Sequence, residues 1–161
     1  MPSTRAPAGT PGGVAVKPDE REVALGEVQA VLAAARDEGY RDKLAALATS
    51  VEQGELVAEE ATELERVLEL GLQAGRIRAV YGPGGEQAAL RLFRRLPAGA
   101  GLAETARSVS AALTSLNGRS LESFRIEVIG PGMYRIALVA GGAEVAVRLD
   151  RSGAQLASVG V

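Results

Sequence analysis

The sequence lacks two residue types that carry much of enzyme chemistry, because its 161 residues include no cysteine and no histidine. Without cysteine there is no disulfide, no thiolate nucleophile and no zinc or iron–sulfur site with Cys ligands. Without histidine there is no Ser–His–Asp relay, no imidazole metal ligand and no side chain that ordinarily titrates near neutral pH. An enzyme made from this chain would depend on carboxylates, Arg, Lys, Tyr or backbone donors. We therefore expect a non-enzymatic protein that uses no cofactor.

Aromatic residues and an excess of positive charge are also lacking. Aromatics make up 3% of the chain and hydrophobic residues 47%, so the core has to be built from Ala, Leu and Val. The formal net charge of −2 disfavours a general polyanion binder, since such proteins usually carry a basic excess. No run of apolar residues approaches the roughly 18 of a membrane span, and the first residues lack the apolar centre of a secretory signal. The sequence predicts a soluble, cytoplasmic protein of bacterial origin.

Proline is concentrated at the N-terminus, where residues 1–18 contain four of the seven prolines and three glycines. Such a segment buries little surface, which predicts a flexible arm; the alternative is a docking peptide that becomes ordered on a partner or a neighbouring subunit. The length of the remainder fits one domain over residues 19–161. This domain comprises an acidic helical half (19–75), a turn with an arginine-rich helix (76–101), and a helix followed by strands (102–161).

Apolar residues recur at three- and four-residue spacing through most of the chain and predict five helices. The first helix has Asp19 as its N-cap and stops at Gly39, and Pro97 ends the fourth, so that residues 97–101 form a loop. The segment Arg76–Tyr81 is either helical or a short extended connector, and its Ile, Val and Tyr favour the connector. The predicted helices cover residues 19–39, 40–51, 55–74, 86–96 and 102–116.

The C-terminal part alternates apolar and polar residues, which is the pattern of strands with one buried face. Phe124, Ile126 and Val128 alternate with charged residues in the first of these strands. Gly141 and Gly142 suit a two-residue hairpin turn, because both positions of such a turn need positive φ. Tight turns force antiparallel neighbours, so four strands form a meander. The predicted fold class is α+β, with about five N-terminal helices packed on a C-terminal four-stranded antiparallel meander.

Charge is segregated along the sequence into an acidic block and a basic block. Residues 52–69 hold seven Glu and one Arg, whereas residues 76–95 hold five Arg and one Glu. Blocks of opposite sign this close together predict ion pairing within the fold or between subunits, and the planar Arg fork suits such pairs. The alternatives are that the basic block is an ordinary solvated face, or that, with its aromatic residues, it binds nucleic-acid phosphates or bases.

The turn Gly82–Gly85 leads into a helix, which is the geometry that presents free backbone N–H groups to an anion. It lacks the Lys-Ser/Thr ending of a nucleotide phosphate loop, and Glu86 at the start of the helix would repel phosphate. A simple turn is therefore the favoured interpretation.

Three glutamates, Glu55, Glu59 and Glu63, fall at four-residue spacing on one face of the helix predicted over 55–74, which is also expected to bury Val57. Such a row can bind a divalent cation or supply an acid of raised pKa. Metal sites usually need ligands from a second element, however, and the sequence offers no matching row. A solvated acidic face is the favoured interpretation. An apolar cavity for a small hydrophobic ligand between sheet and helices is a further alternative.

Together these observations predict an interaction or scaffolding protein that self-associates, through its charge-segregated helices or through an edge of the sheet. The final strand, with Ala157, Val159 and Val161, suits pairing with another chain. The expected partner is a protein or another copy of this chain, and no membrane contact is expected. Nucleic-acid binding ranks second, ahead of a carboxylate-dependent metal enzyme and a carrier of hydrophobic ligands. The candidate interaction surface comprises Arg76, Arg78, Tyr81, Arg91, Arg94, Arg95, Glu55, Glu59 and Glu63.

Overall fold

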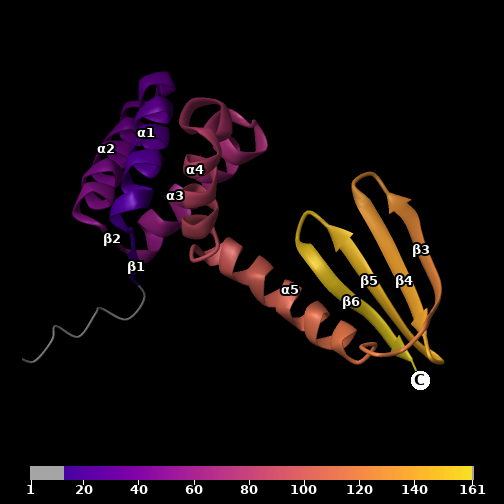
Figure 1. Ribbon diagram of the computed structural model, residues 1–161. Coiled ribbons are helices and arrows are strands. Elements are labelled where there is room, and N and C mark those ends of the chain that lie inside the picture. The colour runs from indigo at the N-terminus through magenta and orange to yellow at the C-terminus, as the bar shows by residue number, and fades with distance from the viewer. Residues whose placement is uncertain (1–12, 161) are drawn as a thin grey trace, which may run out of the picture. The chain divides into compact units, whose positions relative to one another are not determined.

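The computed structural model describes residues 13–160 and confirms the predicted α+β class, with five helices followed by a four-stranded antiparallel sheet (Figure 1). The chain divides into two compact units, Met1–Gly99 and Ala100–Val161, which we call the helical unit and the sheet unit. Each unit has a hydrophobic cluster of its own. The sequence predicts one domain over residues 19–161, whereas the structure divides the apolar packing between these two units.

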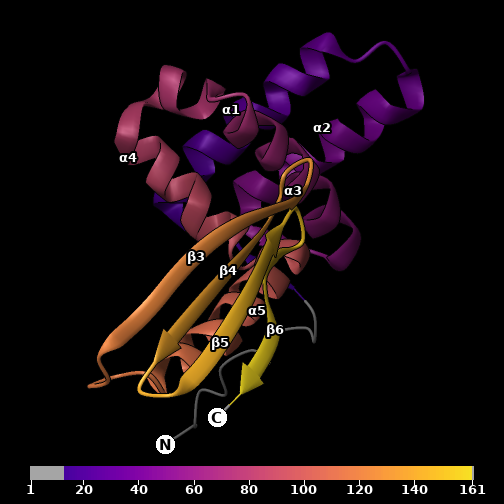
Figure 2. The same ribbon diagram turned by 90° about the vertical axis from the view of Figure 1, so that its right-hand side faces the viewer.

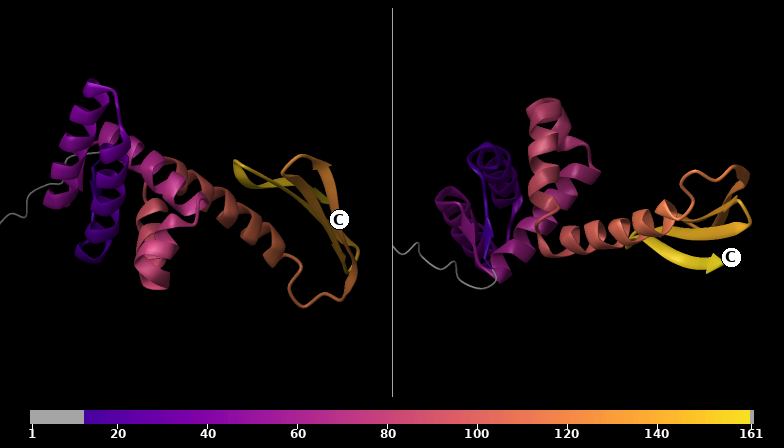
Figure 3. Two further views of the ribbon diagram at one scale, coloured as in Figure 1. Left: turned by 90° about the horizontal axis from the view of Figure 1, so that it is seen from above. Right: turned by 60° about the horizontal axis from the view of Figure 1, so that its bottom comes forward.

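Four helices surround the core of the helical unit, and they bury the apolar faces that the sequence predicts (Figure 3). Val28, Leu44, Leu47, Leu64 and Leu92 are each at most 1% exposed. Burial of these side chains removes apolar surface from water and supplies most of the stability of the unit. The helices of the whole chain are α1 (Pro18–Ala34), α2 (Glu38–Gln53), α3 (Ala58–Gln73), α4 (Arg76–Phe93) and α5 (Pro97–Thr114).

Two short strands bind the start of the described chain to the helical unit. β1 (Val14–Ala15) pairs antiparallel with β2 (Glu55–Leu56), and Val16 is buried with 2% exposure. Residues 1–12 of the arm predicted over 1–18 lie outside the described residues. Residues 13–18, the last part of the predicted arm, are therefore part of the folded helical unit.

The acidic helix α3 begins three residues later than the sequence predicts. Gly54, with φ of 86°, ends α2 in a left-handed conformation, and the next two residues are extended in β2. α3 starts at Ala58, where the Glu60 carboxylate caps the first turn by accepting a hydrogen bond from the Val57 N–H at 3.0 Å. The prediction of a helix over 55–74 is thus wrong for its first turn, and Val57 is 60% exposed rather than buried.

The boundaries of α1 also differ from the prediction. Its N-cap is Lys17 rather than Asp19, because the carboxylate that reaches back to the cap is Glu20, which accepts from the Lys17 N–H at 3.0 Å. Gly39 does not end α1 and lies in the first turn of α2. The Asp37 carboxylate caps that turn by accepting a backbone N–H at 2.7 Å.

The segment Arg76–Tyr81, for which the sequence favours an extended connector, is helical and forms the first part of α4. Gly75 precedes it with φ of 68°, a left-handed conformation that glycine commonly adopts just past the end of a helix. The helix is kinked at Gly82, where φ of 69° and ψ of −173° are accessible almost only to glycine. Pro83 follows, at a position where a helical segment tolerates the missing N–H. The turn Gly82–Gly85 is therefore a kink within α4.

α5 begins at Pro97, so the loop predicted over residues 97–101 is wrong. The physical reason lies in α3, where the Glu65 carboxylate is buried and accepts a hydrogen bond from the Gly99 N–H at 2.9 Å. The first N–H groups of a helix have no acceptor within the helix, and a carboxylate there both satisfies them and complements the helix dipole. This tertiary contact stabilises a helical start in a sequence whose composition is typical of a loop.

The C-terminal meander is confirmed, with neighbouring strands antiparallel and in sequence order (Figure 2). Gly141 and Gly142 have φ of 55° and 76° and form the predicted two-residue hairpin turn. The strands are β3 (Leu121–Gly130), β4 (Met133–Ala140), β5 (Ala143–Asp150) and β6 (Gly153–Gly160).

One helix covers the apolar face of this sheet. Val109 of α5 clusters with Val145 and Val147 of β5, and the partly buried Leu113 and Leu116 pack against them. Figure 2 shows the helix behind the strands. The contacts of α5 are centred on β5, and β3 lies at the edge of the sheet away from them.

Candidate interaction surfaces

Most of the arginines predicted to form an interaction surface are paired with carboxylates of the helical unit. Arg95 donates to both oxygens of Glu20, at 3.0 and 2.5 Å, and to the carbonyl of Ala15 at 3.0 Å. The Glu20 side chain is 0% exposed, so this bidentate pair compensates a buried charge. Arg95 thereby ties the segment after α4 to the first turn of α1 and to β1.

Arg76 and Tyr81 hold α4 against α1. Arg76 pairs with Oε2 of Glu27, whose side chain is 0% exposed and whose Oε1 has no hydrogen-bond partner within the described residues. Burial raises the pKa of the Glu27 carboxyl, and the positive charge of Arg76 opposes that rise. The Tyr81 hydroxyl lies over Gly26, where the Cβ of any other residue would overlap it. Burial raises the pKa of the Tyr81 hydroxyl. Both residues therefore serve internal packing.

The remaining arginines of the block lie nearer the surface. Arg91 pairs with Asp19 at 2.6 Å, and this hydrogen bond lowers the pKa of Asp19. Arg78 pairs with Glu86 at 3.0 Å within α4. Arg94 is exposed and makes no ion pair with any described residue. Four of the five arginines therefore already have a carboxylate partner.

The partners of the basic block come mainly from α1, and no ion pair among the described residues joins it to the acidic block over 52–69. Glu20 and Glu27 are not among the site residues predicted from the sequence. Their spacing of seven residues puts them on one face of α1, and that face also carries the buried Val23 and Val28. Charged residues on an apolar helix face require a partner, which is the signal that points to them.

The structure separates the predicted row of glutamates. Glu55 lies in β2, whereas Glu59 and Glu63 lie on α3. Glu63 accepts hydrogen bonds from the Tyr40 hydroxyl at 2.8 Å and from Arg66 at 3.3 Å. Within residues 13–160 there is no group of three or more acidic side chains placed to hold a metal ion. Glu55 and Glu59 are exposed to solvent, and Glu63 is satisfied by donors of the protein itself.

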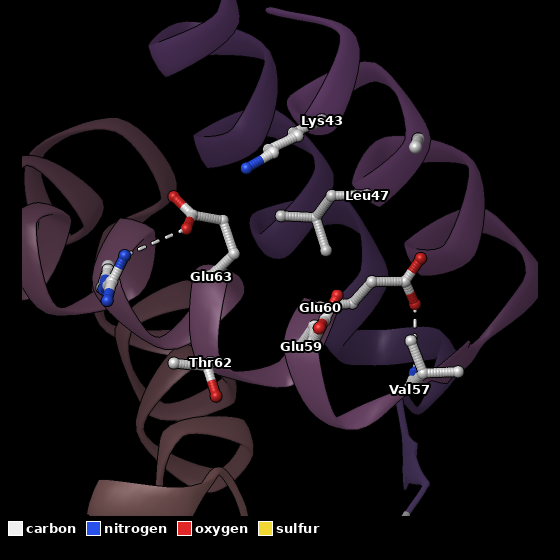
Figure 4. A pocket seen from close by; sticks show the side chains of 9 residues that line it. Lys43, Leu47, Val57, Glu59, Glu60, Thr62 and Glu63 are labelled. Atoms are coloured by element: carbon white, nitrogen blue, oxygen red, sulfur yellow. Dashed lines mark hydrogen bonds and ion pairs between the residues drawn. The ribbon is translucent and has the colours of Figure 1, made fainter. Parts of the chain in front are cut away.

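An open hollow of about 540 Å³ lies where α2 meets α3, lined by Lys43 of α2 and by Glu60 and Glu63 of α3, among others (Figure 4). The oxygens of Glu60 accept from the Ser50 hydroxyl at 2.7 Å and from the Val57 N–H at 3.0 Å. The carboxylates of Glu60 and Glu63 are thus engaged, and no buried polar atom without a partner faces this hollow among the described residues. We assign no ligand to this hollow.

A second hollow lies beside the α4 kink and is lined by Gly84, Gly85, Asp19, Glu22 and Arg91, among others. Arg91 is already paired with Asp19. The two carboxylates oppose the binding of phosphate to the helix segment that begins there. This arrangement agrees with a simple turn and not with an anion site.

Exposed apolar side chains of large size gather in the sheet unit. Ile126 of β3 lies opposite Ile136 of β4, which lies opposite Val147 of β5 beneath α5, so the three share one face. Leu156 (43% exposed) and Val159 (56%) of β6, which lie opposite Val147 and Val145, are also exposed on this face. Toward the β3 edge the exposed side chains include Phe124 (52%), Ile126 (58%), Val128 (74%) and Tyr134 (43%). We call these four residues the β3 apolar face. α5 covers the part of this face that lies over β5 and leaves the β3 apolar face open.

The opposite edge of the sheet is β6, the strand that the sequence favours for pairing with another chain. Val159 is 56% exposed and Ala157 is exposed, while Val161 lies outside the described residues. The sequence pattern identifies Phe124, Ile126 and Val128 as one apolar face but implies that helices cover it. The sequence does not indicate that α5 alone packs on the sheet.

None of the described helices is both long enough and apolar enough to cross a membrane. Comparison with known proteins finds no matching family, no matching curated protein and no matching solved structure. The function therefore has to be inferred from the geometry of the chain alone.

Proposed function

We propose that this chain is a non-enzymatic interaction or scaffolding protein of the cytoplasm that self-associates through its sheet unit. The observation that carries the proposal is the β3 apolar face, whose four large side chains are between 43% and 74% exposed. Single exposed apolar residues are normal in monomers, whereas a contiguous group of them marks a contact surface. Contact between copies at this edge of the sheet removes part of this apolar surface from water.

The composition and the ion pairs support the same proposal. The chain has no His or Cys, which removes the side chains most used for catalysis. Four of the five arginines in the basic block already pair with carboxylates, so few of them remain to bind nucleic-acid phosphates. Interaction through an apolar surface is the function that the geometry supports best.

Sedimentation velocity tests the proposal on the full chain and on two matched variants. Val128 in β3 is 74% exposed, and Val80 on α4 is 63% exposed. The wild type is expected to exceed the 16.6 kDa of the monomer as its concentration rises. Val128→Glu should raise the dissociation constant by about tenfold or more, because a charge enters the contact, while Val80→Glu should leave it unchanged.

Two results would contradict the proposal. A wild type that stays monomeric at every accessible concentration removes self-association. An association that is lost with Val80→Glu and kept with Val128→Glu places the contact on the helical unit instead.

A further inference from the structure

β3 is a ten-residue strand that pairs with β4 along one side. No described strand pairs with its other side, which is the outer edge of the sheet. Such an edge presents unpaired N–H and C=O groups and is a template for another strand. The pairing of β3 with β4 is regular between Ser123 and Val128 and irregular at both ends of that stretch. Ile126 therefore lies near the middle of a regularly paired segment suited to further pairing.

The polar face of this segment carries two charges of opposite sign, Arg125 and Glu127. In β4, Arg125 lies opposite Ala137, so the sheet offers it no charge partner, whereas Glu127 lies opposite Arg135. Neither Arg125 nor Glu127 makes an ion pair with any described residue. The edge thus carries an unpaired positive charge and, two residues further, a negative charge.

These two charges complement each other in one self-pairing register. If two copies of β3 run antiparallel with a two-fold axis at Ile126, Arg125 of each copy lies opposite Glu127 of the other. An axis at Arg125 places Arg opposite Arg, and an axis at Glu127 places Glu opposite Glu. Like charges directly opposite are destabilising, so the sequence of the edge favours the axis at Ile126 over its neighbours.

The same register also matches the apolar side chains. Facing residues of antiparallel strands share one face of a sheet, so Phe124 meets Val128 of the second copy and Ile126 meets its own equivalent. Their apolar contacts across the strands add to the backbone hydrogen bonds. The contact is self-complementary, as a closed two-fold dimer requires.

The edge at β6 also exposes the apolar side chains of Leu156 and Val159, but it lacks the complementary charges. Its solvent-exposed polar face carries Gln155 and Ser158, which have no charge to select a register. Its pairing with β5 is also interrupted by a register shift between Ala146 and Val147. The two edges therefore differ in how strongly they specify a partner.

We propose that β3 pairs antiparallel with β3 of a second copy about a two-fold axis at Ile126, with reciprocal Arg125–Glu127 pairs, joining the two sheets edge to edge. This inference rests on the proposed self-association and adds to it the contact strand, the orientation and the register. The partner is another copy of this chain.

Cysteine cross-linking of the full chain tests the register, because the natural sequence has no cysteine that would compete. Residues at the axis have Cα atoms about 5 Å apart, within the span of a disulfide. Ile126→Cys alone should therefore form a disulfide dimer under mild oxidation. Phe124→Cys and Val128→Cys should each form little alone, since equivalent residues lie about 14 Å apart, and should cross-link when mixed.

Val159→Cys in β6 is the matched control, since Val159 is 56% exposed and Ile126 is 58% exposed. Pairing through β3 predicts a far slower disulfide for Val159→Cys than for Ile126→Cys. A wild type that associates while Val159→Cys cross-links and Ile126→Cys does not would overturn the β3 pairing and leave the proposed self-association in place. A wild type that is monomeric throughout would overturn both.

Discussion

At the scale of single residues, the helical unit depends on carboxylates that lie in an apolar core. Glu20, Glu27 and Glu65 are 1%, 0% and 7% exposed, and each accepts a hydrogen bond from another segment. A buried charge is costly unless it is paired, so the donors matter more than exposed charges do. These contacts connect α1, α3 and α4 to segments that the sequence alone does not place beside them.

Arg95→Ala should destabilise the helical unit strongly, because it leaves the Glu20 carboxylate buried without its bidentate partner. We expect a loss of about 3 kcal/mol in the free energy of unfolding, measured by urea denaturation followed through the helical circular dichroism signal. Arg94→Ala is the matched control, since Arg94 is exposed and unpaired within the described residues, and its effect should stay within about 0.5 kcal/mol. Equal losses for the two variants would show that the Glu20 pair does not stabilise the fold.

At the scale of elements, α4 shows how one glycine sets the direction of a helix. Gly82 has φ of 69° and ψ of −173°, and no atom lies within 4 Å of where a Cβ would stand. Gly84 has an equally open environment but does not have positive φ. The two positions therefore differ in backbone conformation and not in space.

Gly82→Ala should destabilise the protein by about 1–3 kcal/mol, since the kink requires a conformation that alanine rarely adopts. Gly84→Ala should be neutral or stabilise by up to about 1 kcal/mol, because alanine favours a helix where the backbone is ordinary. Thermal unfolding followed by circular dichroism measures both. Similar midpoints for the two variants would mean that the chain relaxes the kink without cost.

The elements that periodicity predicts well are those whose pattern is local. The four strands and the hairpin at Gly141–Gly142 follow from alternation and turn chemistry. Two of the errors occur where a distant partner decides the conformation. Pairing with β1 holds Glu55 and Leu56 in a strand. The hydrogen bond from the Gly99 N–H to the Glu65 carboxylate stabilises a helix over residues 97–101. No local signal carries such contacts.

The candidate surfaces show the same limit. The sequence predicts that the arginine block pairs with the acidic block over 52–69, within the fold or between subunits. Among the described residues it pairs instead with Asp19, Glu20 and Glu27 of α1. The sequence identifies Phe124 and Ile126 as part of an apolar strand face. Whether a helix covers that face depends on how helices divide between the two units, which spacing along the chain cannot specify.

At the scale of the whole molecule, the division into two units explains why an apolar surface remains open. Four helices share the core of the helical unit, while the cluster of the sheet unit is built from one helix and the strands. A four-stranded sheet with one covering helix leaves its β3 side exposed. Pairing of β3 with a second copy gives that edge a partner.

Charge reversal at the edge is the sharpest test of the β3 pairing, with sedimentation velocity at low ionic strength as the measurement. Each of Arg125→Glu and Glu127→Arg turns two attractive pairs of the dimer into repulsive ones. Each pair contributes about 1 kcal/mol, so each variant should raise the dissociation constant by at least about tenfold.

An equimolar mixture of the two variants should recover association. In the mixed dimer the two substituted side chains face each other with opposite charges, and the unchanged Glu127 of one chain faces the unchanged Arg125 of the other. A mixture that stays as weak as its components, beside a wild type that associates, would contradict the β3 pairing.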